Sequence, residues 1–328
     1  MSDQVLVGVD IGGTKTAVVL SFRPPVVIHR IVFPTLPAEG PSPILVRIVE
    51  AIRESLSLQD LSVADLKSIG VSCGSPLDPI NGVIQEPPNL PTWKNVPIKA
   101  LLEREFQVEC FLENDANAGA LAEHRFGAGR GVRNMVFLTM GTGIGAGLIL
   151  NGHLYRGTTY SAGEIGHVRL TQSGPLGHNK AGTVEGWASG AGMTRMATVM
   201  IESAVERGET TLLTLPKIRN GYLVSAHDIW KAAQAGDCLA QSIVATSGAR
   251  LGEAMAMMID ILNPECIVVG GLAVRMREAL LGPARAVVQR EALVTSVNAC
   301  RIVAAALEEQ VGDIAALCVA MEGHYHAA

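Results

Sequence analysis

The residues with the clearest chemical potential are Glu113-Asn114-Asp115-Ala116-Asn117. An apolar run, residues 108–112, precedes them and predicts a strand, and an Ala- and Glu-rich run, residues 118–126, predicts a helix. Asp115 therefore stands near a strand-to-helix junction, where open α/β sheets bind their ligands. A carboxylate at such a junction can be a helix cap or a general base. Caps are the commoner of the two, but glycine-rich segments on both sides favour the base.

A second group of polar residues lies among glycines and small residues, in segments 163–167 and 182–187. Glu164 and Glu185 could accept hydrogen bonds from sugar hydroxyls, because a carboxylate offers two acceptor oxygens. His167 has two interpretations that the sequence leaves open. It can be a polar residue satisfied within the fold or a metal ligand.

A glycine-containing turn joins two apolar runs at the start of the chain. Residues 5–10 and 16–22 predict strands, and Ile11-Gly12-Gly13-Thr14 between them predicts a β-hairpin. Its glycines would let backbone N–H groups approach a phosphate, with Thr14 as a further donor and Asp10 holding Mg²⁺ directly or through water. The alternative is an ordinary hairpin that ends in an acidic residue.

The same arrangement recurs near the middle of the chain. Residues 134–139 predict a strand, alternating glycines follow in 141–147, and residues 148–150 continue as a strand. Neither hairpin matches a P-loop or a dinucleotide-binding motif. Two such hairpins, at the starts of two α/β halves, indicate a weak internal repeat.

Three further loops could contact a ligand. Two are turn-rich, residues 74–79 and 87–93, and the second contains Asn89. Asn89 suits a hydroxyl-rich ligand, and an Asx turn is an equally good interpretation. The third follows a buried strand, residues 267–269, where Gly270-Gly271 could lie flat against a planar base or could simply allow close strand–helix packing.

Regular elements frame these motifs. Residues 66–72 predict a strand, and helical periodicity covers 43–57 and 226–262. Further helices are expected from about Arg275 and over residues 312–322.

Composition excludes several classes of protein. The chain has 328 residues, 48% of them apolar and 17% charged, so a large core and about two domains are expected. A net charge of −5 and the lack of a basic patch argue against nucleic acid as a partner. No apolar run reaches membrane-spanning length, and the start of the chain does not resemble a signal peptide, so a cytoplasmic location is expected. The scattered cysteines are expected to be mostly buried thiols, at positions 73, 110, 238, 266, 300 and 318.

Taken together, these motifs resemble the ROK family of sugar kinases, on the actin/hexokinase-like ATPase fold. The resemblance covers nearly the whole chain. It implies an α/β protein with two βββαβα-type domains and a cleft between them. The expected N-terminal domain covers residues 1–115 and is rejoined by 312–328, and the larger C-terminal domain covers 116–311. The matching segments are Asp10-Ile11-Gly12-Gly13-Thr14-Lys15, Pro88-Asn89-Leu90, Glu113 to Asn117, Gly141-Thr142-Gly143-Ile144-Gly145, Gly163 to His167 and Asn263 to Gly271.

The resemblance also implies roles for individual residues. Asp115 would be the general base in an ATP-dependent transfer of phosphate to a hexose, at the 6-OH, with a glucokinase-like preference. Mg²⁺ would accompany ATP, and a homodimer is expected because dimers are common in the family. The sugar would contact Ser75, Asn89, Asn114, Glu164, His167 and Glu185. ATP and its metal would contact Asp10, Gly12, Gly13, Thr14, Lys15, Thr142, Gly143, Gly270 and Gly271.

The chain departs from the family pattern at two places. Many members carry zinc-binding cysteines after the Gly-His pair, where this chain has Leu176, His178 and Thr183, so structural zinc is not expected. The segment Gly74-Ser75-Pro76 replaces a usual Pro-Gly-Pro, which leaves the preferred sugar open.

Alternative functions remain open at this point. They are a polyphosphate-dependent sugar kinase, a chaperone- or actin-type ATPase and a non-enzymatic sugar sensor. The family's repressors carry a winged helix before the first strand, and a strand that starts at Val5 is expected to leave no room for one.

Overall fold

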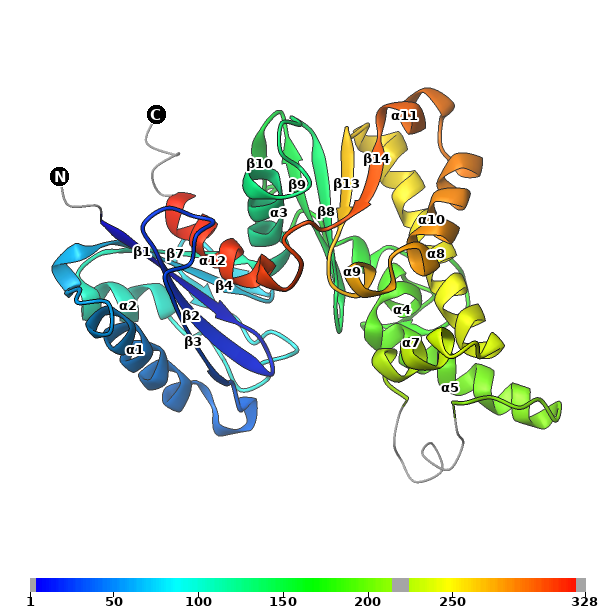
Figure 1. Ribbon diagram of the computed structural model, residues 1–328, viewed down its shortest axis with the longest axis horizontal. Helices are drawn as coiled ribbons and strands as arrows, with labels where there is room; N and C mark the ends of the chain where they lie inside the picture. Colours follow the sequence, from blue (N-terminus) through cyan, green and yellow to red (C-terminus); the bar gives the residue numbers. More distant parts are fainter. Residues whose placement is uncertain (1–3, 214–223, 323–328) are drawn as a thin grey trace. The chain divides into compact units, whose positions relative to one another are not determined.

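The computed structural model describes residues 4–213 and 224–322, which fold into two compact α/β units (Figure 1). The first unit comprises residues 4–130, 156–160 and 309–322 of the described chain. The second comprises residues 131–155 and 161–308, apart from 214–223. The first unit is therefore assembled from segments that are distant in the sequence.

The first unit is built on a five-stranded mixed sheet with the strand order β3-β2-β1-β4-β7. The first three strands of the chain pair antiparallel, whereas β1, β4 and β7 run parallel. The inner strands are buried on both faces, as parallel strands covered by helices require. The strands are β1 (Val5–Ile11), β2 (Lys15–Ser21), β3 (His29–Pro34), β4 (Leu66–Cys73) and β7 (Glu109–Asn114).

Helices cover this sheet, and one of them comes from the end of the described chain. Helix α12 (Val311–Glu322) contacts β1 and β4 (Figure 1). Glycines make this approach possible, because a Cβ on Gly70 would lie 2.1 Å from the backbone N of Ala320. The other long helices of the unit are α1 (Pro41–Ser57), α2 (Ile98–Phe106) and α3 (Asp115–Phe126).

The second unit repeats the topology of the first. Its sheet has the order β10-β9-β8-β13-β14, with an antiparallel meander followed by two parallel neighbours. The weak internal repeat expected from the two hairpins is therefore confirmed, because each hairpin opens a sheet of the same construction. The strands are β8 (Met135–Met140), β9 (Ile144–Leu150), β10 (His153–Tyr155), β13 (Cys266–Val269) and β14 (Arg301–Ala304).

Helices α8 and α10 contact each other extensively and contribute many residues to the large core of the second unit. Predicted helix 226–262 is two helices in the structure, because Gly236 has a φ of +90° and Asp237 caps a new helix. The helices are α4 (Val184–Ala188), α5 (Gly190–Glu206), α7 (Ala226–Gln234), α8 (Cys238–Leu262), α9 (Leu272–Met276), α10 (Glu278–Glu291) and α11 (Val294–Ala299).

Short elements complete the fold. Two small hairpins form from β5 (Leu77–Asp78) with β6 (Val83–Ile84), and from β11 (Leu176–Gly177) with β12 (Lys180–Ala181). The 3₁₀ turns are η1 (Pro37–Glu39), η2 (Val63–Asp65), η3 (Ile165–His167) and η4 (Glu308–Gln310).

The division into domains after residue 115 stays a prediction. In the structure, α3 packs against α12, and contacts group residues 116–130 with the first unit. Within the described residues, no helix combines the length and the apolar character that crossing a bilayer requires. The expectation of buried thiols is confirmed for Cys73, Cys110, Cys266 and Cys318, while Cys300 is partly exposed and Cys238 is exposed.

Candidate active site

The carboxyl ends of three parallel strands bring the first group of site residues together. In the register of the sheet, Asp10 on β1 pairs with Ser72 on β4, and Ser72 pairs with Glu113 on β7. One residue further along, Cys73 pairs with Asn114. The loops that follow these strands therefore start from one edge, which is the edge where open α/β sheets bind ligands.

Asp115 is the first residue of α3, and its neighbour Asn114 is the N-cap. Asn114 Oδ1 accepts hydrogen bonds from the backbone N of Ala116 at 2.9 Å and of Asn117 at 3.3 Å. Asp115 itself is exposed, and its Oδ1 accepts from the backbone N of Ala116 at 2.8 Å. The capping interpretation of Asp115 is therefore wrong, because Asn114 occupies that position.

Asn114 also ties the helix start to the loop after β4. Its Nδ2 donates to Ser75 Oγ over 2.7 Å. The amide oxygen is occupied by the cap, so Asn114 could offer a ligand only the second hydrogen of Nδ2. Ser75 is half-buried, and its hydroxyl can still donate a hydrogen bond while it accepts this one.

Asp10 lies at the same edge as a second carboxylate. Its pKa is raised from 3.8 to about 6, chiefly by burial and next by the negative charge of Asp115, against a lowering by its hydrogen bond with Ser72. Gly312, at the start of α12, comes close to it: a Cβ there would lie 2.5 Å from Asp10 Oδ2. Such a carboxylate ionises at a cost that a bound cation would offset.

Glu113 is a buried carboxylate to which sequence patterns assigned no role. Its Oε1 accepts from the backbone N of Asn114 at 3.0 Å and from Asn117 Nδ2 at 2.9 Å, and its Oε2 pairs with Arg156 Nε at 2.7 Å. Arg156 also pairs with Glu322 at 3.3 Å. Glu113 thus stabilises the junction of β7 and α3 through its hydrogen bonds to Asn114 and Asn117. A charged residue at the end of an otherwise apolar strand is the sequence signal that could have identified it.

The glycines of the first hairpin make room for a side chain. Neither Gly12 nor Gly13 has a positive φ, so the turn is not one of the left-handed hairpin types. Instead, a Cβ on Gly13 would lie 2.8 Å from Asn89 Cβ, and one on Gly74 would lie 3.2 Å from Asn89 Oδ1. Gly12 N closes the turn by donating to Lys15 O over 3.0 Å.

Asn89 therefore stands beside the turn that was expected to bind phosphate. It is exposed, and its side chain makes no hydrogen bond within the described residues, so the Asx-turn interpretation does not hold. Thr14 and Lys15 in the turn are exposed as well. The Asn89 amide is available both to donate to a ligand and to accept from one.

The second hairpin turn is fixed by the start of α5. Gly190 N donates to Gly141 O over 2.8 Å, and Ala191 N donates to Thr142 O over 3.2 Å. Gly141 N donates to Gly143 O over 3.0 Å, and Thr142 is exposed. A glycine turn beside a helix N-terminus is an environment that suits anions.

Glu185, in the first turn of α4, faces this glycine turn. A Cβ on Gly143 would lie 2.8 Å from Glu185 Oε2. The other oxygen, Oε1, lies 3.2 Å from His178 Nε2, and the His178 ring stacks on His167 with 4.1 Å between ring centroids. Glu164 is exposed at the N-cap position of η3 and makes no capping hydrogen bond. The second unit therefore gathers Gly143, His167 and Glu185 through His178, which sequence reasoning noted only as a lost zinc-ligand position.

Gly270 and Gly271 link β13 to α9. Gly270 N donates to Leu138 O over 2.8 Å, which extends the pairing of β13 with β8. Gly271 has a φ of +63°, and a Cβ there would lie 2.1 Å from Met140 O. The close-packing interpretation is thus confirmed for this turn, and contact with a nucleotide base stays a prediction.

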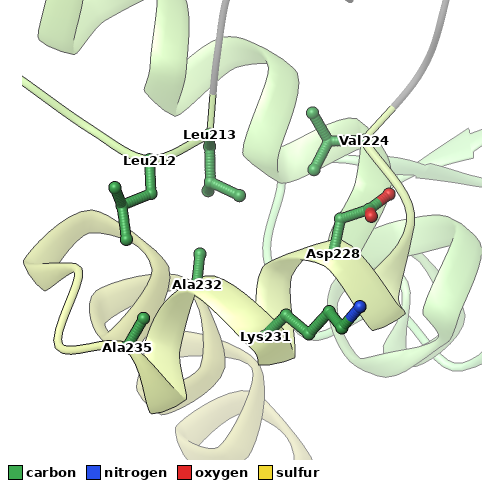
Figure 2. A pocket seen from close by; sticks show the side chains of 7 residues that line it. All are labelled: Leu212, Leu213, Val224, Asp228, Lys231, Ala232 and Ala235. Carbon is green, nitrogen blue, oxygen red and sulfur yellow. The ribbon is translucent and has the colours of Figure 1, made fainter.

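Among the residues that the structure describes, no three His, Cys, Asp or Glu side chains are grouped as a metal site would need. A hollow of about 260 Å³ beside α7 is lined by Leu212, Leu213, Val224 and side chains of that helix (Figure 2). None of the expected site residues lines it.

Known relatives of the chain include both kinases and repressors. A protein of Halalkalibacterium halodurans described as glucokinase is 36% identical over 285 residues, 86% of this chain and 84% of the relative. A Thermotoga maritima glucokinase is 34% identical and covers 97% of each chain. A putative xylose repressor of a Caldicellulosiruptor species is 26% identical over 97% of this chain and 77% of its own length.

Solved structures share the fold. A ROK hexokinase from Thermus thermophilus superposes with a TM-score of 0.80 at 28% identity, over 99% of this chain and 100% of the other. A ROK glucokinase from Streptomyces griseus, in complex with glucose and AMPPNP, gives a TM-score of 0.77 at 28% identity, over 97% and 100%. The expected actin/hexokinase-like ATPase fold is therefore confirmed. Residues 6–322 match the family description, and the chain belongs to the ROK family.

Proposed function

We propose that the protein is an ATP-dependent hexose kinase with a glucokinase-like preference, which phosphorylates the 6-OH of its sugar. The observation that carries this proposal is the junction of β7 and α3. There the helix cap is supplied by Asn114, so the exposed Asp115 carboxylate is not needed for capping. The kinase relatives and the glucose and AMPPNP complex of a family member support the same assignment.

Asp115 is the proton acceptor in this mechanism. A sugar hydroxyl is too weak an acid to ionise near neutral pH, so its proton must leave as the new bond forms. The O6–H bond breaks toward the Asp115 carboxylate, O6 bonds to the γ-phosphorus, and the bond from that phosphorus to the β-phosphate oxygen breaks. The electron pair of the broken bond leaves with ADP.

Each unit holds polar side chains that suit contact with a sugar. In the first unit, Asn89 lies beside the turn at Gly13, and Ser75 accepts a hydrogen bond from Asn114. In the second unit, Glu185 faces the turn at Gly143, and His167 stacks on His178, which contacts Glu185. Glu164, exposed and without a capping hydrogen bond, adds a further acceptor. Acceptors with fixed positions distinguish hydroxyl configurations.

Each unit contributes a glycine turn that suits the phosphate groups of ATP. The first offers Gly12, Gly13, Thr14 and Lys15, and the second offers Thr142 and Gly143, while Gly270 and Gly271 lie beside adenosine. Asp10, whose pKa is raised to about 6, fits a carboxylate that meets Mg²⁺, directly or through water. When bound, Mg²⁺ neutralises charge that develops on the phosphate oxygens.

The proposal extends to the setting in which the enzyme works. The protein acts in the cytoplasm as a homodimer and does not bind nucleic acid. A net charge of −5 supports the last point. The zinc positions of other family members hold Leu176, His178 and Thr183 here, which supports activity without structural zinc.

A non-enzymatic sugar sensor is the second candidate function, because repressors are among the relatives. A panel of glucose, fructose, mannose and N-acetylhexosamines, each assayed for ADP release with ATP, separates the candidates. The enzyme releases ADP only with its preferred sugar, and the product carries phosphate on O6. Sugar binding without ADP release would establish the sensor, and sugar-independent ATP hydrolysis would establish an ATPase. Repeating the panel with polyphosphate tests the alternative donor.

A further inference from the structure

The hairpin formed by β11 and β12 places one histidine against the candidate sugar site. Its two turn residues, His178 and Asn179, have φ values of +48° and +59°, which corresponds to a tight two-residue hairpin turn. The left-handed region is uncommon for residues other than glycine. A strained two-residue turn holds the direction of the His178 side chain more firmly than an open loop would.

His178 contacts two residues that are expected to bind sugar. Its Nε2 lies 3.2 Å from Glu185 Oε1, and its ring stacks on His167 with an interplanar angle of 20°. Lys180, on the next strand, donates from Nζ to the backbone oxygen of His167 over 2.8 Å. The hairpin therefore contacts both Glu185 and His167.

Glu185 has a position that depends on this support. The side chain is 15% exposed, and its Oε2 faces the glycine turn at Gly143. His178 is the partner at the other oxygen. A carboxylate that loses such a partner regains rotational freedom, which must be lost again when a ligand binds.

We propose that His178 is a positioning residue that holds the Glu185 carboxylate in the orientation that receives sugar hydroxyls. This inference rests on the proposed function in assigning Glu185 to the sugar. Asn114, by comparison, is held by its own helix start and by Ser75. His178 thus gives the second unit an orienting contact of a different kind, made by a hairpin tip.

The test compares glucose binding by calorimetry with steady-state kinetics in the full-length protein. His178→Ala is expected to weaken glucose binding and raise its KM about fivefold, the scale of a partly exposed polar contact with a carboxylate. The kcat and the KM for ATP should change by less than about threefold, because His178 lies away from the reacting atoms. His178→Gln keeps a donor of similar reach and should restore most of the glucose affinity.

Two further variants separate positioning from general damage. His153→Ala removes an exposed histidine of the same unit and should leave glucose affinity unchanged. In a Glu185→Gln background, His178→Ala should cost less than about twofold, because the charged partner has already been removed. An equal cost in both backgrounds, or normal glucose affinity in His178→Ala, would overturn the inference.

Failure of the proposed function would look different. A wild-type protein that binds glucose without releasing ADP contradicts the kinase assignment, while the calorimetric comparison of His178→Ala still decides the inference. A metal site would overturn the inference. It would be shown by activity that a chelator removes and that excess Mg²⁺ does not restore, together with zinc measured in the purified protein.

Discussion

The two sheets of this protein share one topology but differ in charge at the same edge. In the order β3-β2-β1-β4-β7, the last strands lead to Asp10, Glu113 and Asp115. In the order β10-β9-β8-β13-β14, the residue that corresponds to Asp10, next to last in its strand, is Thr139. The first sheet supplies carboxylates, whereas the second supplies backbone groups and hydroxyls. The two similar sheets are thus proposed to serve two different chemical roles.

The two glycine turns show where the sheets remain alike. In each turn a glycine makes room for a polar side chain from elsewhere in its unit: Gly13 for Asn89, and Gly143 for Glu185. Neither glycine has a positive φ. A turn proposed to bind phosphate and a side chain proposed to bind sugar are therefore packed together in each unit. This packing can be tested separately from the difference in charge.

The largest effect on stability is expected from the buried ion pair between Arg156 and Glu113, near the end of β7 in the first sheet. Arg156→Met leaves Glu113, with 5% of its side chain exposed, without its cation, and should lower the free energy of unfolding by about 3 kcal/mol. The matched control in the second unit is Arg207→Met, which breaks a fully exposed pair with Glu209 and should change the free energy of unfolding far less, because solvent screens such a pair. Urea unfolding of both variants measures the difference. Equal losses would mean that the first edge is not specially dependent on charge.

A smaller effect, with a distinct pH dependence, is expected at Asp10. Its folded pKa of about 6 lies above the ordinary 3.8, so the native state binds this proton more tightly than the unfolded state does. The stability that this contributes is present below pH 3.8 and is lost as the pH rises toward 6. Asp10→Asn cannot ionise and should therefore gain about 1–3 kcal/mol over wild type between about pH 4 and pH 7.5, without Mg²⁺.

The control for Asp10 is its counterpart in the second sheet. Thr139→Val should change the free energy of unfolding by an amount that does not vary over the same pH range, because no ionisable group is removed. Urea unfolding of Asp10→Asn and Thr139→Val, measured at about pH 4 and at about pH 7.5, gives the comparison. An Asp10→Asn difference that is the same at both values would show that this carboxylate does not titrate as proposed.

The smallest effect is expected at the second glycine turn. Gly143→Ala places a Cβ 2.8 Å from Glu185 Oε2 and should raise the KM for sugar about three- to tenfold by displacing that carboxylate. Gly141→Ala, two residues away, points its Cβ into open space and should leave the KM for sugar unchanged. Steady-state kinetics of the pair, with sugar varied, distinguishes a local clash from a general disturbance of the turn. If both alanines raised this KM alike, the packing of Glu185 on Gly143 would not matter for binding.

The regular elements and the motifs were largely predictable from local sequence. Apolar runs located β1, β4 and β13, and the order of motifs identified the family. The junction at Asp115 was predictable as a position, since a strand signal gives way to a helix signal there. Which neighbour caps the helix was not, because Asn114 and Asp115 are both good capping residues and only backbone geometry distinguishes them.

Contacts between distant segments were not predictable. Glu113 meets Arg156 and Arg156 meets Glu322, pairs separated by 43 and 166 residues, and no local pattern connects them. The contact of His178 with Glu185 depends on a turn whose two residues, His178 and Asn179, are left-handed although neither is glycine. The need for glycine at positions 13 and 143 was also not predictable. It arises from a side chain of another segment, Asn89 or Glu185, and not from the backbone conformation.

The proposed mechanism depends most on Asp115, the carboxylate proposed to receive the sugar proton. The direct measurement is kcat together with glucose affinity for Asp115→Asn, beside Asp60→Asn as an exposed control in the same unit. Loss of the general base should lower kcat by about 10²–10⁴-fold while the calorimetric affinity for glucose stays within about threefold of wild type. An Asp115→Asn protein that turns over glucose at close to the wild-type kcat would contradict the account.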